Sequence, residues 1–508
     1  MRNYLFFSAL PLVCSNIAYA DWRDDISWEE LQEWATLNSV TLPTSTALTV
    51  GISEAQTRKE TYPGSGVYDY GYAPDPSYSQ FSDESITDVS NIPMDIYSSH
   101  ANGTASYFFG NTTSFMPSIG HANVYEAGNF AFSKLFSTPT SGWSESVMSH
   151  AWIGSSGSVN NTRFISAMLD QTTIDSSVLH IVGIKNGAQS LQSELLCHNY
   201  NNLSVGRSDG NHSYGSIPSG YEGADRQKPE LVSPLGTTSA STAAIASMAI
   251  FLREHANTHS SLNAKLPVVL KSCILAGTNK EKLTDWENSS SEPIDDTFGA
   301  GEADILSSLR ILNESESSTG AVGLRGWDYA SILNQAQEYT ITIPSYASSA
   351  KICANLSWNR NASYGNYSTL TDYSLTLKDS SDNVIFNSDS PVNNLEHVWQ
   401  TGLQPGTYTL VVNKSNDTNL STFYALAWRT EVETNNAHST LTKTETLNQI
   451  SFSNLAPEHS YILERNIDQT TWQEVSTLTS TVTGTLDYND PNTSLGDQVF
   501  YRLRYFTP

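Results

Sequence analysis

Ser239 is the residue in this chain best placed to act as a nucleophile. Residues 228–234 (KPELVSP) predict an extended segment, and residues 235–239 (LGTTS) predict a tight turn ending at Ser239. Residues 240–247 (ASTAAIAS) then predict a helix slim enough to cross a protein core. The unpaired N–H groups and the dipole at a helix N-terminus stabilise negative charge, so an oxyanion is favoured beside this serine. The alternative is an N-cap serine on a buried helix.

The segment around Ser239 resembles a family motif. Residues 237–243 (TTSASTA) are similar to the Gly-Thr-Ser-x-Ala/Ser-Thr/Ala-Pro segment of the subtilisin-like serine peptidases, which follows a Lys-Pro-Asp-x-Val-Ala-Pro stretch. Two positions depart from that motif, because Thr237 replaces a glycine and Ala243 replaces a proline. The resemblance implies a catalytic triad that runs acid, histidine, serine along the chain.

Glu54 is the candidate acid of that triad. Residues 48–55 (LTVGISEA) predict a short buried strand that ends in a carboxylate, and they resemble the first family strand with glutamate in place of aspartate. Glutamate can accept the histidine ring N–H if its backbone lies back by about one bond length, on the order of 1.5 Å. The alternative is that Asp69, Asp75 or Asp95 supplies the acid.

The base has two possible registers in residues 98–110, which resemble the family's His-Gly-Thr-His-Val-Ala-Gly helix. Letter for letter, Asn102 takes the place of the first histidine. Asparagine cannot remove a proton from Ser239, so an active enzyme requires the other register, in which His100 is the base.

Residues 177–187 predict a buried strand ending in Asn-Gly, and they resemble the family segment whose asparagine amide completes the oxyanion hole. Asn186 is therefore the candidate donor, and a plain turn residue is the alternative. Residues 147–154 resemble the strand that pairs with an extended substrate. This resemblance places Trp152, Ile153 and Gly154 at the border of the cleft, unless they belong to a buried strand without substrate contact.

The hydrophobic pattern predicts an α/β fold with a subtilisin-like parallel sheet covered by helices on both faces, followed by an antiparallel β-sandwich and a small β module. Further stretches at 201–208, 266–277 and 298–304 resemble family segments in family order. The predicted domains are a signal peptide (1–20), a short N-terminal segment (21–47), a catalytic domain (48–312), a β-sandwich (321–429) and a small fibronectin-like module (430–508), with a polar linker at 313–320.

The composition of the chain limits the kinds of partner that it can bind. The chain has 508 residues and a net charge of −26, so nucleic acid and anionic membranes are poor partners. Residues 1–20 carry one early arginine, an apolar stretch and Ala-Tyr-Ala before Asp21, which is typical of a secretory signal. We expect a secreted monomer without a membrane anchor whose partner is a protein or peptide substrate. The segment 21–47 is shorter than the pro-segment of many subtilisin-like enzymes.

No cofactor is expected from the sequence. Calcium is conceivable, because residues 68–70 and 487–490 carry oxygen ligands in stretches that read as loops, but such loops are more often solvated. Glu396 and His397 suggest either a metal ligand or, more simply, an exposed strand pair. Cys197 and Cys273 either form a disulfide or remain buried thiols.

Two functions follow. The first is a secreted serine endopeptidase in which His100 deprotonates Ser239, Glu54 orients the imidazole, and Asn186 binds the oxyanion. The second is a secreted pseudoenzyme or adhesion protein that binds a polymer or surface through its β modules. The replaced aspartate, the Asn102 register and the short N-terminal segment favour the second, whereas the ordered motifs favour the first.

Overall fold

The protein is described from a computed structural model. The structure describes residues 21–505, apart from 138–141, 193, 333–334, 346, 415–421, 435–437, 444–447, 454, 456–459, 467–471, 482–484 and 491–499. The predicted signal peptide, residues 1–20, lies outside the described residues. Among those that are described, no helix is both long enough and apolar enough to cross a membrane.

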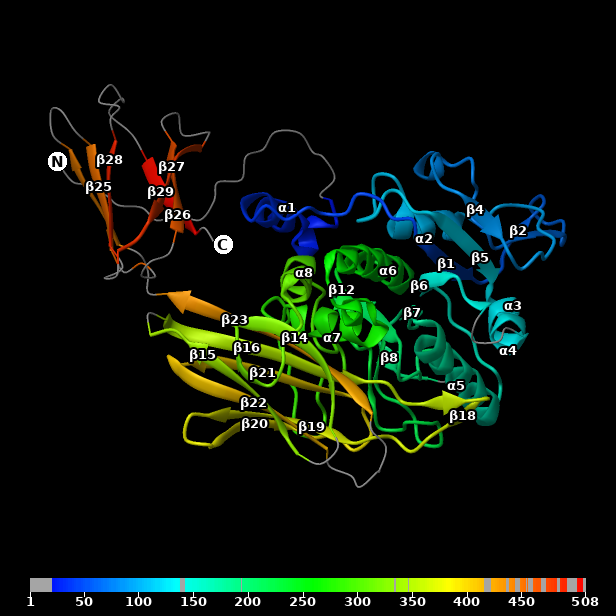
Figure 1. Ribbon diagram of the computed structural model, residues 1–508. Helices are drawn as coiled ribbons and strands as arrows, with labels where there is room; N and C mark the ends of the chain where they lie inside the picture. Colours follow the sequence, from blue (N-terminus) through cyan, green and yellow to red (C-terminus); the bar gives the residue numbers. More distant parts are fainter. Residues whose placement is uncertain are drawn as a thin grey trace.

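A seven-stranded parallel sheet forms the first half of the molecule (Figure 1). Its spatial order is β12-β9-β7-β6-β1-β5-β4. Strands β5 and β4 therefore lie on one side of β1, and β6, β7, β9 and β12 follow in chain order on the other side. The strands are β1 (Thr49–Glu54), β4 (Ile86–Asp88), β5 (His121–Glu126), β6 (Glu145–His150), β7 (Leu179–Gly183), β9 (Leu203–Arg207) and β12 (Leu231–Ser233).

Both faces of this sheet are buried, as near-continuous apolar strands predict. Neighbouring residues of β6 enter different cores, Val147 on one face and Met148 on the other, and Ile181 and Val182 of β7 do the same. The described helices of this domain are α2 (Ser99–Phe109), α3 (Ala127–Asn129), α4 (Leu135–Ser137), α5 (Val159–Ser176), α6 (Thr238–His255), α7 (Pro267–Gly277) and α8 (Ile305–Asn313). The predicted parallel α/β arrangement is thereby confirmed.

A β-sandwich follows, with its own apolar core between two sheets. One sheet has the order β13-β15-β22-β19-β20 and the other β14-β23-β16-β21, and all pairs but β13 with β15 are antiparallel. The strands are β13 (Gly320–Val322), β14 (Arg325–Ser331), β15 (Gln337–Ile343), β16 (Ala347–Trp358), β19 (Tyr373–Asp379), β20 (Val384–Ser388), β21 (Leu395–Leu403), β22 (Gly406–Lys414) and β23 (Phe423–Thr434).

The sandwich packs against helix α7 of the first domain. Every residue of α7 is buried, and the Ser272 hydroxyl donates to the backbone oxygens of Asn355 (2.7 Å) and Ala425 (3.1 Å) in the sandwich. From the other side, the Arg429 guanidinium donates to the Ala276 oxygen at 3.0 Å. A helix whose residues are all buried needs such cover on every face.

The last module consists of two three-stranded antiparallel sheets over a small core. They contain β24 (His438–Lys443), β25 (Asn448–Ser453) and β28 (Leu486–Asp490), and β26 (Ser460–Asn466), β27 (Gln473–Thr479) and β29 (Phe500–Tyr505). Short pairs elsewhere are β2 (Thr57–Glu60) with β3 (Tyr68–Gly71), and β17 (Ala362–Ser363) with β18 (Asn366–Tyr367), while β8 (Gln189–Ser190), β10 (Ser213–Ser216) and β11 (Gln227–Lys228) form a small sheet.

Several expectations need correction. Glu396 and His397 are not an exposed strand pair, because both are fully buried and Glu396 accepts a hydrogen bond from the Ser390 N–H at 2.8 Å. The two stretches read as calcium loops lie on strands β3 and β28. In β28, Asp490 instead accepts from Arg465 (2.8 Å) and Tyr501 (2.6 Å).

Two smaller points concern the N-terminus and the cysteines. Ser27 precedes α1 (Trp28–Leu37), but its side chain does not cap that helix and donates to Asp304 at 3.1 Å. The three cysteines within the described ranges, Cys197, Cys273 and Cys353, are buried free thiols, so the open question of a Cys197–Cys273 disulfide is answered.

Candidate active site

Glu54 and His100 meet at the carboxyl edge of the sheet. Glu54 is the last residue of β1 and its side chain is almost fully buried, whereas His100 lies in the first turn of α2. The Ser98 hydroxyl starts that helix by accepting from the Ala101 N–H at 3.2 Å. The His100 Nδ1 then lies 2.8 Å from the Glu54 Oε2. A carboxylate only accepts, so Nδ1 carries the proton and Nε2 keeps its lone pair.

Thr104 holds the other oxygen of this carboxylate, and sequence reasoning missed it. Its hydroxyl donates to the Glu54 Oε1 at 2.6 Å. The signal for this residue was its position four residues after His100, which places it on the same helix face. The hydrogen bond from His100 to Glu54 raises the pKa of His100 above its usual 6.5, although burial acts in the opposite direction.

Ser239 is the second residue of α6 rather than its N-cap. The N-cap is Thr237, whose side chain accepts from the Ala240 N–H at 3.2 Å, so the N-cap interpretation of Ser239 is wrong. The Ser239 side chain is half-buried, and its hydroxyl donates to the Ala151 backbone oxygen at 3.2 Å. Transfer of its proton to His100 therefore requires rotation of this hydroxyl away from Ala151, a common difference between a resting and a substrate-bound site.

Asn186 lies between β7 and the start of α6. Its Oδ1 accepts from the Thr238 N–H at 2.9 Å, which orients the amide and leaves the Nδ2 donors for another acceptor. Thr238 precedes Ser239, so this hydrogen bond fixes the donor amide beside the serine. Sequence reasoning placed Asn186 here but did not foresee its bond to α6.

One pocket of about 250 Å³ lies at this edge of the sheet. Its lining includes His100, Asn186 and Ser239 together with the backbone segments at Ala151–Ile153 and Gly183–Lys185. The side chains of two predicted border residues differ: Trp152 is buried and donates to the Ser53 hydroxyl at 2.9 Å, whereas Ile153 is exposed. Gly154 does not line the pocket, and its oxygen accepts from the Leu195 N–H at 2.8 Å.

The rival residues lie elsewhere. The Asn102 Oδ1 accepts from the Asp75 N–H at 2.7 Å, on a side of α2 away from Glu54. Asp95 accepts from the Tyr70 N–H at 3.2 Å, and Asp69 lies on β3 opposite Lys59. None of these three aspartates contacts the His100 ring.

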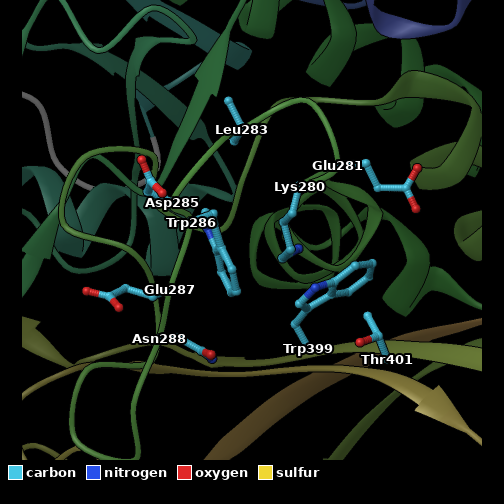
Figure 2. A pocket seen from close by; sticks show the side chains of 9 residues that line it. All are labelled: Lys280, Glu281, Leu283, Asp285, Trp286, Glu287, Asn288, Trp399 and Thr401. Carbon is cyan, nitrogen blue, oxygen red and sulfur yellow. The ribbon is translucent and has the colours of Figure 1, made fainter.

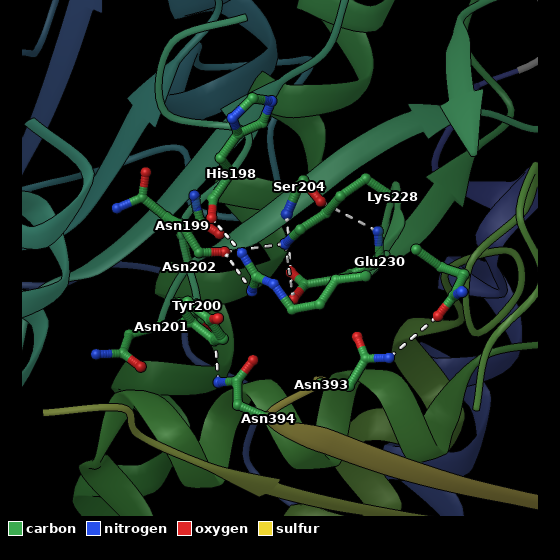
Figure 3. A network of polar contacts seen from close by, with 12 residues as sticks. His198, Asn199, Tyr200, Asn201, Asn202, Ser204, Lys228, Glu230, Asn393 and Asn394 are labelled. Atoms are coloured by element: carbon green, nitrogen blue, oxygen red, sulfur yellow. Dashed lines mark hydrogen bonds and ion pairs between the residues drawn. The ribbon is translucent and has the colours of Figure 1, made fainter. Parts of the chain in front are cut away.

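A buried ionic network supports the strand that leads to Ser239 (Figure 3). Glu230 lies between Lys228 (3.0 Å) and Lys271 (2.8 Å), and all three side chains are buried. Burial alone raises the pKa of Glu230, but the two ammonium groups more than reverse this and lower it. Burial lowers the pKa of Lys228 to about 8. This network fixes residues 228–233 immediately ahead of the turn to α6.

A second hollow, of about 450 Å³, lies between the loop 280–288 and strand β21 (Figure 2). Lys280 occupies its centre, 5.2 Å from the Trp286 ring and 4.9 Å from the Trp399 ring. The Lys280 ammonium donates to the Thr278 hydroxyl (3.0 Å) and the Cys353 thiol (3.4 Å). These contacts join the two domains.

Comparisons with known proteins add a likeness of shape only. No family model and no curated protein matches the sequence. Among solved structures, tripeptidyl peptidase 2 is similar over 81% of this chain and 52% of its own, at 9% identity and a TM-score of 0.30. The pre-peptidase C-terminal domain of a collagenase from Bacillus anthracis is similar over 23% of this chain and 99% of its own, at 21% identity and a TM-score of 0.17. At these values the likeness decides nothing about function.

Proposed function

We propose that this protein is a subtilisin-like serine endopeptidase that hydrolyses peptide bonds through an acyl-enzyme on Ser239. One observation carries the proposal: a buried carboxylate, Glu54, bonds the Nδ1 of a half-exposed histidine, His100, at 2.8 Å in a pocket that Ser239 also lines. An acid, a base and a hydroxyl in this relation form the nucleophile-activating arrangement of serine hydrolases.

In the first half of the reaction, Nε2 of His100 takes the Ser239 hydroxyl proton while Oγ bonds to the scissile carbonyl carbon. The carbonyl oxygen gains the negative charge and is bound by the Asn186 amide and the Ser239 backbone N–H at the start of α6. Glu54 stabilises the imidazolium without taking its proton. The carbon–nitrogen bond then breaks, and the amine leaves with the proton from His100.

In the second half, water enters beside the ester. His100 takes a proton from this water, whose oxygen bonds to the acyl carbon and forms a second oxyanion in the same site. Collapse returns the proton to Ser239 Oγ and releases the acid product. The segment at Ala151–Ile153 lies beside Ser239, so an extended peptide would lie against it with the scissile bond at the hydroxyl.

A fluorophosphonate probe tests this proposal, because it reacts only with an activated serine. The full chain should be labelled, and the Ser239→Ala variant should not. Ser241→Ala is the matched control, since Ser241 lies two residues later on α6 and its hydroxyl faces the Ser233 oxygen in the interior. Equal labelling of the unsubstituted chain and Ser239→Ala would overturn the assignment.

The rival, a pseudoenzyme or adhesion protein, predicts that the unsubstituted chain is not labelled and leaves casein intact. Endopeptidase action predicts internal cleavage of casein that disappears in Ser239→Ala. Secretion is part of the proposal and rests on residues 1–20. Expression with this segment should place the protein outside the cytoplasm with Asp21 as its first residue, as N-terminal sequencing would show.

A further inference from the structure

Three metal-ligating side chains lie together in the turns between β8 and β9, outside the candidate active site. Glu194, Cys197 and His198 are all buried. One carboxylate oxygen, the sulfur and one ring nitrogen all lie within 4.8 Å of one another. Each side chain offers a ligand atom of a kind that binds transition metals.

Two potential ligand atoms of these side chains are buried without a hydrogen-bond partner, the Glu194 Oε1 and the His198 Nδ1. The other atom of each group is engaged by Gln192. The Glu194 Oε2 accepts from the Gln192 N–H at 2.9 Å, and the His198 Nε2 lies 3.1 Å from the Gln192 oxygen. Buried acceptors without a donor are rare in native structures and call for an explanation, which a bound cation would supply.

The contact with Gln192 also fixes the tautomer of His198. A backbone oxygen only accepts, so Nε2 carries the proton and Nδ1 presents its lone pair. Metal-binding histidines commonly donate their second N–H to a backbone oxygen in this way, which orients the ring toward the ion. The histidine is therefore preset as a ligand before any metal arrives.

The ligand set favours zinc over calcium or magnesium. Calcium and magnesium take oxygen ligands almost exclusively, whereas zinc combines sulfur, nitrogen and carboxylate oxygen. A thiolate, a carboxylate and a neutral imidazole around a divalent ion sum to zero charge, which suits a buried site. Tetrahedral ligands at zinc lie about 3.5 Å apart, so small side-chain rotations would close the site.

Two neighbouring cations, Arg226 and Lys228, donate to acceptors other than the three proposed ligand atoms. Arg226 donates to the backbone oxygens of His198 and Asn199, and Lys228 donates to Asn199 at 3.1 Å and pairs with Glu230. Figure 3 shows the His198 ring pointing away from this network, with only its backbone joined to it.

We propose that Glu194, Cys197 and His198 bind a zinc ion, with water or a backbone oxygen in the fourth position. Leu195, between the ligands, donates its N–H to the Gly154 oxygen at 2.8 Å and packs in the same core as Trp152. The ion would thus hold the wall behind the pocket segment Ala151–Ile153. Zinc binding does not depend on the proposed peptidase activity, whereas any effect on cleavage does.

Cobalt substitution tests the site in the full chain. We expect one equivalent of Co²⁺ to give visible bands of tetrahedral intensity and a near-ultraviolet thiolate-to-cobalt band. Cys197→Ser should abolish the thiolate band, and His198→Gln should weaken binding at least tenfold. Cys273→Ser is the matched control, because Cys273 is another buried free thiol that lies on α7. A weak octahedral spectrum that Cys197→Ser leaves unchanged would overturn the proposal.

A second measurement needs no variant that alters the site. Chelation of the unsubstituted protein should lower its Tm, and zinc, but not magnesium or calcium, should restore it. A Tm that ignores both chelator and zinc would contradict the site. The same cobalt spectrum should appear in Ser239→Ala, so failure of the metal site and failure of the proposed peptidase remain distinguishable.

Discussion

Glu230 and Glu54 are two buried glutamates whose ionisable partners differ in what they leave free for a ligand. Glu230 is enclosed by Lys228 and Lys271, and the exposed fraction of each of the three side chains is at most 2%. Glu54 is equally buried, at 1%, but its partner His100 is 41% exposed. The first cluster is closed on every side, whereas the second ends in a ring nitrogen at a pocket.

This difference separates a structural ion pair from a site that can do chemistry. The Lys271 ammonium donates to Glu230 and to the backbone oxygens of Tyr200 and Asn202, so it has no donor left for a ligand. His100 uses only its Nδ1 in the contact with Glu54. The unused acceptor on a pocket wall, rather than burial or charge as such, makes Glu54 the candidate catalytic glutamate.

The largest expected effect comes from Glu54→Gln. An amide at this position cannot stabilise the imidazolium and favours the wrong tautomer of His100, so kcat/KM should fall about 10⁴-fold. Initial rates on a peptide substrate measure this. Glu60→Gln is the control, because the Glu60 carboxylate accepts from the Gly64 and Gly66 N–H groups and does not line the pocket. A loss of less than tenfold would place Glu54 with Glu230 as a structural group.

Asn186→Ala should lower kcat about 10²- to 10³-fold with little change in KM, the range known for an oxyanion donor of subtilisin. Asn186→Asp sharpens the test. It keeps an acceptor for the Thr238 N–H and lacks the amide donor, so it should be as impaired as the alanine variant. Full activity in Asn186→Asp would assign this residue to the support of α6 alone.

Lys271→Met should act on stability rather than on chemistry. Removal of one partner from a buried ion pair leaves Glu230 undercompensated, and we expect a loss of about 3 kcal/mol in the free energy of unfolding. Denaturant titration measures it, and activity per folded molecule should stay within about twofold of the parent. Lys282→Met is the control, since its pair with Glu302 is more than half exposed on the lysine side and should contribute less than about 1 kcal/mol.

The smallest effect concerns pH. His100 acts as a base only when Nε2 is unprotonated, so kcat/KM should fall as pH drops through the pKa of His100. Because Glu54 raises this pKa, the midpoint of the acid limb should lie above 6.5. His121→Gln, which alters a histidine bonded to Ser85 near the surface, should leave the midpoint unchanged. A midpoint below 6.5 would contradict the Glu54 contact.

The sequence predicted the fold and the positions of the chemical groups because both depend on local pattern. Glu54 ends an apolar strand and Ser239 follows a turn into a small-residue helix, and strand ends and helix starts of a parallel sheet meet at one edge. The choice between His100 and Asn102 could not be made in this way. Two residues on a helix point about 200° apart, and only the element across from α2 decides which side faces Glu54.

Burial of a side chain by distant segments of the chain could not be predicted from the sequence either. In the sequence, Glu396 and His397 look like an exposed strand pair. In the structure, both side chains are buried, and the Asn288 amide donates to the His397 oxygen at 3.2 Å. The unpartnered atoms of Glu194 and His198 likewise depend on how a loop turns back on itself. A spacing in sequence gives no sign of such tertiary contacts.

Helix α7 carries a consequence for how the chain is handled. Because Ser272 is tied to both Asn355 and Ala425, the sandwich is the outer wall of the parallel-sheet domain. A protein shortened after α8 would expose the apolar surface of α7 to water and self-associate. The two domains should therefore depend on one another for stability, and a cut between them should destabilise both rather than release a stable smaller form.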